Sequence, residues 1–87
     1  MTASAVDSYR ERVAAALADG SRFAGLHATS DRALVGTLLA SPDGSTRLET
    51  VASEDGVAPS IVDLAPAAGW DEREAHDLQG IRFAGHE

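Results

Sequence analysis

A short turn between two apolar runs most constrains how this chain can fold. The turn is Ser41-Pro-Asp-Gly-Ser45, and it separates the runs 33–40 and Thr46–Ala52. Proline presets one backbone dihedral and glycine accepts a positive φ, so these residues favour a tight reversal of the chain. Two strand-length apolar runs joined by such a turn predict an antiparallel hairpin.

The two runs of this hairpin are expected to lie differently in a sheet. Apolar residues fall on both sides of the run 33–40, so this strand is expected to be buried on both faces or nearly so. In the run Thr46–Ala52, Leu48 and Val51 point to opposite faces unless a bulge intervenes. The second run is therefore expected at an edge of the sheet.

Helix and strand patterns precede the hairpin. Apolar residues at spacings of three and four predict an amphipathic helix over residues 3–19, with Ser4 as its N-cap and Gly20 as its stop. A short apolar run predicts a first strand over residues 22–29.

The chain after the hairpin is expected to form a loop, a strand, a helix and an extended tail. The loop covers residues 54–59, the brief strand 60–64 and the helix about 67–78. Gly80 then occupies the position at which a glycine ends a helix in the left-handed conformation. The tail 81–86 alternates and is expected to be extended.

These elements predict one domain over residues 1–87. A chain of 87 residues buries only about 60–65% of its unfolded surface, so its core is modest. The predicted fold class is α/β (α+β), a two-layer domain in which both helices pack on one face of a small, mostly antiparallel or mixed sheet. The core is built largely from small aliphatic residues, and a partner could complete it.

Composition excludes several functions. The net charge is −7 and the chain has no lysine, so it lacks the clustered basic face that nucleic-acid binding needs. Without cysteine it forms no disulfide and no cysteine-ligated cluster. No apolar run approaches the roughly 20 residues that cross a bilayer, and no secretory signal is visible. We therefore expect a cytoplasmic protein without direct membrane insertion.

The densest cluster of charge follows the chain's one tryptophan, Trp70. On a helix Trp70 and Glu74 share a face, and Arg73 can pair with Asp77 one turn further on. We expect these paired charges to surround a partly buried indole. On that basis Trp70→Ala is expected to destabilise the domain by about 3–5 kcal/mol.

A catalytic interpretation of the same cluster is the main alternative. Glu72, Glu74 and Asp77 would be acid or base groups, with His76 as a proton carrier or metal ligand, in a small metal-dependent hydrolase. Nothing nearby supplies a nucleophile or a phosphate-cradling glycine loop, and the histidine spacing does not suit a zinc helix. A free-standing interaction protein is a second alternative.

The order of residues in the last third of the chain resembles a known family. The matching positions are Pro59-Ser-Ile, Ala67-Ala68, Trp70, Glu72-Arg73-Glu74, Asp77-Leu78, Gly80-Ile81, Phe83 and Gly85-His86. Together they resemble the signature of the 30-kDa subunit of respiratory complex I, the NADH-quinone oxidoreductase. The same module is similar to the N-terminal domain of the large subunit of formate-hydrogenlyase-type NiFe hydrogenases.

The resemblance implies a structural domain with no cofactor and no catalytic residue of its own. It would pack against the large catalytic subunit in the peripheral arm of a membrane complex, on the cytoplasmic side. Iron–sulfur clusters, nickel–iron or quinone would belong to partner subunits. Its signature residues would be structural or interfacial: Trp70, Glu72, Arg73, Glu74 and Asp77 on the helix, and Gly80, Ile81, Phe83, Gly85 and His86 in the segment that leads to the partner.

Three positions depart from the family pattern. His76 stands where the complex I branch usually has tyrosine, and Gln79 stands where an aromatic residue is usual. Glu87 follows the Gly-His pair in place of proline. These departures favour the hydrogenase branch or a divergent relative, and they suggest the excised N-terminal part of a longer chain.

Overall fold

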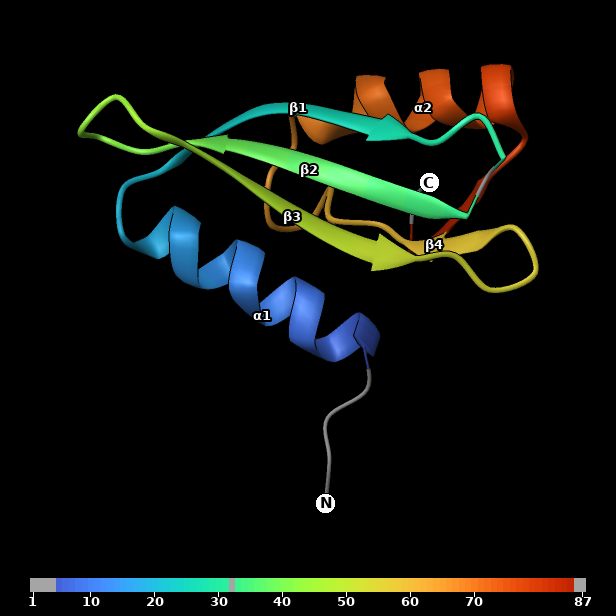
Figure 1. Ribbon diagram of the computed structural model, residues 1–87, viewed down its shortest axis with the longest axis horizontal. Helices are drawn as coiled ribbons and strands as arrows, with labels where there is room; N and C mark the ends of the chain where they lie inside the picture. The colour runs from blue at the N-terminus through green and yellow to red at the C-terminus, as the bar shows by residue number, and fades with distance from the viewer. Residues whose placement is uncertain (1–4, 32, 86–87) are drawn as a thin grey trace.

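The computed structural model describes residues 5–31 and 33–85, which form two helices and five strands (Figure 1). In chain order these are α1 (Ala5–Ala18), β1 (Arg22–Ala28), β2 (Leu34–Ala40), β3 (Thr46–Ala52), β4 (Val57–Pro59), α2 (Ala68–Gln79) and β5 (Arg82–Ala84). The architecture is a small α+β domain with an antiparallel three-stranded sheet and a separate parallel pair, which confirms the predicted fold class. The proposed N-cap, Ser4, lies outside the described residues.

The hairpin of β2 and β3 is confirmed. Its antiparallel register is continuous from Leu34 opposite Ala52 to Ala40 opposite Thr46. In the turn, the Ser45 amide donates to Asp43 Oδ1 over 2.9 Å, and Gly44 adopts a φ of 91°. The turn residues therefore set the register of the two strands they join.

The sheet has the order β1-β2-β3, so β3 is an edge strand as predicted. No bulge interrupts its pairing with β2: Val51 faces the core, and Leu48 points outward with 62% of its surface exposed. The register shift lies in β1 instead, between Phe23 and Gly25. The strand β3 therefore keeps a regular register and leaves Leu48 in solvent, where a bulge would have turned it toward the core.

The expectation that β2 is buried on both faces or nearly so is confirmed for one face and holds in part for the other, where Gly36, Leu38 and Ala40 are partly buried. Val35, Thr37 and Leu39 are fully buried beneath the helices. On the opposite face Leu34 is 42% exposed. The second face is only partly covered because the two helices contribute to a single core on the other side.

The segment after β3 differs most from the prediction. Residues 60–64 form no strand, because the Leu64 and Ala65 amides both donate to the Ile61 carbonyl in a turn. The strand β4 lies within the expected loop, where it pairs in parallel with β5. Its partner is more than 20 residues away along the chain, so no local pattern identifies it.

Both helices bury side chains in one core. Its fully or nearly buried members are Tyr9, Val13, Leu26, Val35, Val51, Ala58, Ile61, Ala65, Ala68 and Ile81. Figure 1 shows α1 beside β3 and α2 running along β1. At the centre, the buried Tyr9 hydroxyl and Thr37 Oγ1 share a hydrogen bond of 2.5 Å, which joins α1 to the central strand.

We predict that Tyr9, the chain's one tyrosine, ionises at a higher pH than a free tyrosine side chain. Burial raises the pKa of its phenol, against the opposing effect of the Thr37 hydrogen bond. Because the folded-state pKa is the higher one, its contribution to stability is complete below about pH 10 and is lost as the pH rises through the folded-state value. A tyrosinate absorbance titration measures the shift, and Tyr9→Phe should flatten the alkaline fall in stability. Ionisation at the pH of N-acetyltyrosinamide would contradict the prediction.

Candidate functional site

The inner face of α2 carries a buried carboxylate. Glu72 lies between the two buried alanines of this helix, Ala68 and Ala75, and its exposed fraction is 0%. Its Oε1 accepts a hydrogen bond of 2.7 Å from Ser60 Oγ, and its Oε2 accepts one of 2.8 Å from the Ile61 amide. A charge removed from water is tolerated only with such partners, so this contact fixes where α2 sits.

Ser60 directly follows β4 and connects its own segment to α2, β5 and α1. Its hydroxyl reaches α2 through Glu72, and its amide donates to the Ala84 carbonyl of β5 over 2.9 Å. Its carbonyl accepts a 2.5 Å hydrogen bond from Arg10 Nη1 of α1. Arg10 also pairs with Asp63 over 2.6 Å and lowers the pKa of that carboxyl. We call Glu72, Ser60, Arg10 and Asp63 the Ser60 junction.

A second carboxylate of α2 covers the edge of β1. Asp71 Oδ2 accepts a hydrogen bond of 2.9 Å from the backbone amide of Leu26. A Cβ added to the neighbouring Gly25 would lie 3.9 Å from the same oxygen. Helices that cover sheet edges prevent unwanted strand pairing, and Asp71 provides the polar contact for that role here.

The end of α2 and the following segment are also held by backbone contacts. Gly80 ends the helix in the predicted left-handed conformation, with a φ of 75° and its amide donating to the His76 carbonyl. His76 Nδ1 lies 2.9 Å from the Ile81 carbonyl oxygen, and Ile81 is fully buried. Phe83, in β5, packs against the core, and Gly85 has a φ of 93°. His86 lies outside the described residues.

The expected burial of Trp70 is wrong. Its side chain is 75% exposed, because position 70 lies about 200° around the helix from Ala68, on the side away from the core. Among the described residues, ion pairs join Arg10 to Asp63 and join Glu49 to two arginines. The expected Arg73–Asp77 pair is not among them. The polar contacts that the sequence predicted around Trp70 are found instead at the Ser60 junction, between Ser60 and Glu72.

The outward-pointing residues of α2 form one surface, which we call the α2 outer face. Its members are Trp70, Arg73, Glu74, Asp77 and Leu78, and all five are exposed. Leu78 has 71% of its surface exposed. Three of the charged site residues predicted on this helix, Arg73, Glu74 and Asp77, thus belong to this face, whereas Glu72 belongs to the interior.

Sequence reasoning missed Arg10, Ser60, Asp63 and Asp71. Each acts across the fold, as in the 53-residue separation of Arg10 and Asp63. The Pro-Ser-Ile triplet was the one signal for Ser60, and it came from the family resemblance. A charged residue such as Arg10 is ordinary on an amphipathic helix, so its presence does not indicate a contact with a distant part of the chain.

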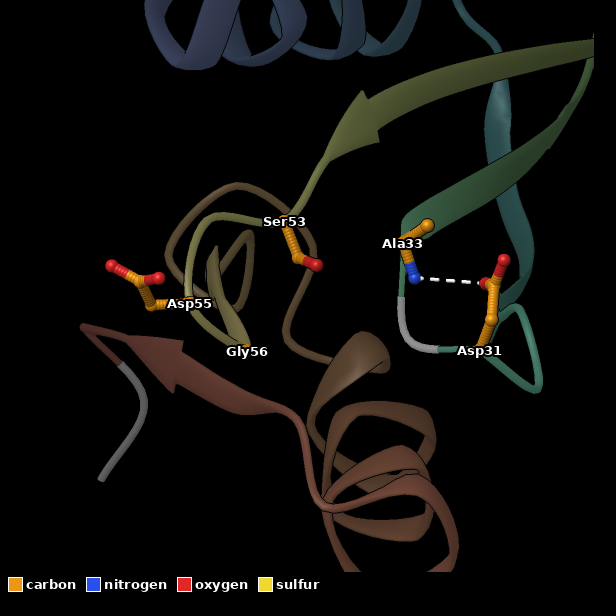
Figure 2. A pocket seen from close by; sticks show the side chains of 5 residues that line it. All are labelled: Asp31, Ala33, Ser53, Asp55 and Gly56. Atoms are coloured by element: carbon orange, nitrogen blue, oxygen red, sulfur yellow. Dashed lines mark hydrogen bonds between the residues drawn. The ribbon is translucent and has the colours of Figure 1, made fainter.

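A small open cavity of about 330 Å³ lies between the end of β3 and the turn before β2 (Figure 2). Asp31, Ala33, Ser53, Asp55 and Gly56 line it. Asp31 Oδ1 already accepts hydrogen bonds from Thr29 Oγ1 and the Ala33 amide, which hold the turn.

Across residues 5–31 and 33–85, no three His, Asp or Glu side chains come together in a way that could hold a metal ion. Neither helix in the described part of the chain has the length and apolar character that a membrane crossing requires.

Fold and site together define a small two-layer α+β domain whose buried polar groups join its elements. The family model described as the 30 Kd subunit of respiratory-chain NADH dehydrogenase matches residues 2–87. The chain therefore belongs to this family, as the resemblance in its last third indicated.

Individual relatives agree with this assignment. The chain is 52% identical over 40 residues to the C-subunit of NADH-quinone oxidoreductase from Rhodopseudomonas palustris, and 50% identical over 40 residues to that from Rhodobacter capsulatus. Each match covers 46% of this chain and 20% of the relative. A solved structure described as the trypsin-resistant fragment (1-134) of Nqo5 matches with a TM-score of 0.67 and 28% identity, over 90% of this chain and 76% of that one.

We predict that Glu72 and Trp70 differ sharply in their effect on folding. Glu72→Ala leaves the Ile61 amide and the Ser60 hydroxyl without this acceptor in the interior, so it should lower the free energy of unfolding by about 2–6 kcal/mol, about 1–3 kcal/mol for each group. Trp70→Ala removes an exposed side chain and should change it by less than about 0.5 kcal/mol. Denaturant unfolding of both variants measures the difference. Equal destabilisation by the two would contradict the division of α2 into an inner and an outer face.

Proposed function

We propose that this domain is a non-catalytic docking module of a complex I-like NADH-quinone oxidoreductase. In this role it holds the large catalytic subunit in the peripheral arm, on the cytoplasmic side of the membrane. Redox centres and quinone chemistry belong to the partner subunits. Membership of the 30 Kd subunit family supports the type of complex.

The observation that carries the docking role is the division of α2 into two faces. Its inner face is tied to the rest of the fold through Glu72 and Asp71. Its outer face leaves Trp70 and Leu78 in solvent at 75% and 71% exposure. A helix that is firmly attached on one side and carries exposed apolar side chains on the other favours contact with another protein.

The signature residues divide between these tasks. Glu72, Gly80 and Ile81 hold α2 and the segment after it, since they are buried or cap the helix. The exposed side chains that would contact a partner are Trp70, Arg73, Glu74 and Asp77. Phe83 and Gly85 belong to β5 and its end, and with His86 they would lead the chain toward that partner.

A formate-hydrogenlyase-type host complex is the second candidate. The residues that favour it are His76 and Gln79, which replace the tyrosine and the aromatic residue usual in the complex I branch. The Nδ1 of His76 lies at hydrogen-bonding distance from the Ile81 carbonyl. Histidine therefore has a structural contact of its own at this position. The similarity to named subunits of NADH-quinone oxidoreductases favours the quinone-reducing complex.

Co-purification tests this proposal. The tagged full-length native protein is expressed in its own host, and the proteins retained with it are identified by mass spectrometry. We expect the large subunit of an NADH-quinone oxidoreductase to be recovered in stoichiometric amount. A hydrogenase large subunit in its place would support the second candidate.

Failure to retain either large subunit would overturn the docking role. Metal analysis of the same preparation of this protein, freed of its partners, addresses the hydrolase alternative. A stoichiometric transition metal that is lost on His76→Ala would favour that alternative. The matched control is His27→Ala, since His27 is an exposed histidine on β1.

A further inference from the structure

We propose that the α2 outer face docks into an apolar recess lined by cationic side chains on the large catalytic subunit, with Trp70 and Leu78 as the two anchors. This inference rests on the proposed docking function and specifies its surface and the chemistry of its partner.

The first observation is the position of the chain's one tryptophan. The core is assembled from smaller aliphatic side chains and Tyr9, whereas Trp70 is left 75% exposed. Leu78 is 71% exposed and lies about 12 Å further along the same helix. A single exposed apolar residue is ordinary, but two large ones within one short helix are typical of a contact surface. Tryptophan is also among the residues that most often dominate binding energy.

The second observation is the charge between these anchors. Glu74 and Asp77 lie on the same side of α2 as Trp70, separated from it by one and two helical turns. Neither is in an ion pair within the described residues, and Arg73 is the one cation on this face. The chain as a whole carries a net charge of −7. Electrostatic complementarity therefore favours a cationic partner surface.

Arginine suits this surface better than lysine. Its guanidinium can accept a carboxylate in a bidentate arrangement and can also stack on an indole ring. A guanidinium placed between Trp70 and Glu74 would make both contacts at once. We therefore expect arginine side chains at the rim of the recess.

The third observation is that the α2 outer face is already in a fixed position. Glu72 and Asp71 attach the helix at one end and Gly80 closes it at the other. A surface that is ordered before binding loses little conformational entropy in the complex. The helix has 12 residues and is about 18 Å long, so it covers only part of the roughly 800 Å² that each partner buries in a stable interface. The face acts as the anchor of a larger contact.

The experiment uses the full-length native protein and the large subunit of the NADH-quinone oxidoreductase from the same genome. Affinity is measured for Trp70→Ala and for the double variant Glu74→Lys/Asp77→Lys at low and high salt. Two controls are matched in chemistry but lie elsewhere. Leu48→Ala removes a leucine that is 62% exposed on β3, and Glu11→Lys reverses an exposed charge on α1.

We expect Trp70→Ala to weaken binding about 30-fold, as for the loss of a dominant interface residue. The double charge reversal should weaken binding at low salt and reduce its dependence on salt, because it removes the attraction to the cationic rim. Both controls should bind as the unaltered protein does. Thermal unfolding of all four variants should match the unaltered protein, which separates lost contact from lost folding.

The outcomes distinguish the two proposals. If the unaltered protein binds the large subunit and both α2 variants bind equally well, the inference about α2 is overturned and the docking function stands. If the double reversal strengthens binding, the recess is not cationic and the inference is likewise overturned. If the unaltered protein does not bind, the docking function fails and takes this inference with it.

Discussion

The arrangement of this domain depends on one buried carboxylate. Burying an ion costs several kcal/mol unless hydrogen bonds replace its water, so Glu72 can lie inside only where Ser60 Oγ and the Ile61 amide meet it. The same serine binds β5 through its amide and α1 through Arg10. A displacement of any of these elements would leave a charge or a backbone group without its partner. Glu72 therefore specifies where these elements lie relative to one another.

Sequence patterns predicted the elements whose causes are local. The turn chemistry of Asp43 and Gly44 lies within the hairpin it creates, and Gly80 caps the helix that immediately precedes it. The parallel pairing of β4 with β5 and the bond from Leu26 to Asp71 were not predictable in the same way. Each needs a partner more than 20 residues distant, and its residues look ordinary without that partner.

The error over Trp70 shows a limit of helical patterns. Periodicity indicated correctly that Trp70 and Glu74 share a face of α2, but it cannot say which face turns inward. The size and hydrophobicity of the indole favoured the side of the helix that carries Trp70 as the buried one. The structure turns the opposite side inward because Ala68 and Ala75 allow close approach and Glu72 finds its partners there. A satisfied polar contact together with close packing outweighed the burial of one large ring.

This orientation gives the two sides of α2 separate physical tasks. The side that holds Glu72 belongs to the fold, and its replacement would disturb every contact made through Ser60. The side that holds Trp70 contributes little to the isolated domain, since most of that ring is already in water. An apolar side chain kept in water lowers solubility and brings the fold no matching gain. Together with the exposed Leu78 on the same helix, Trp70 forms the apolar pair that the proposed docking contact would bury.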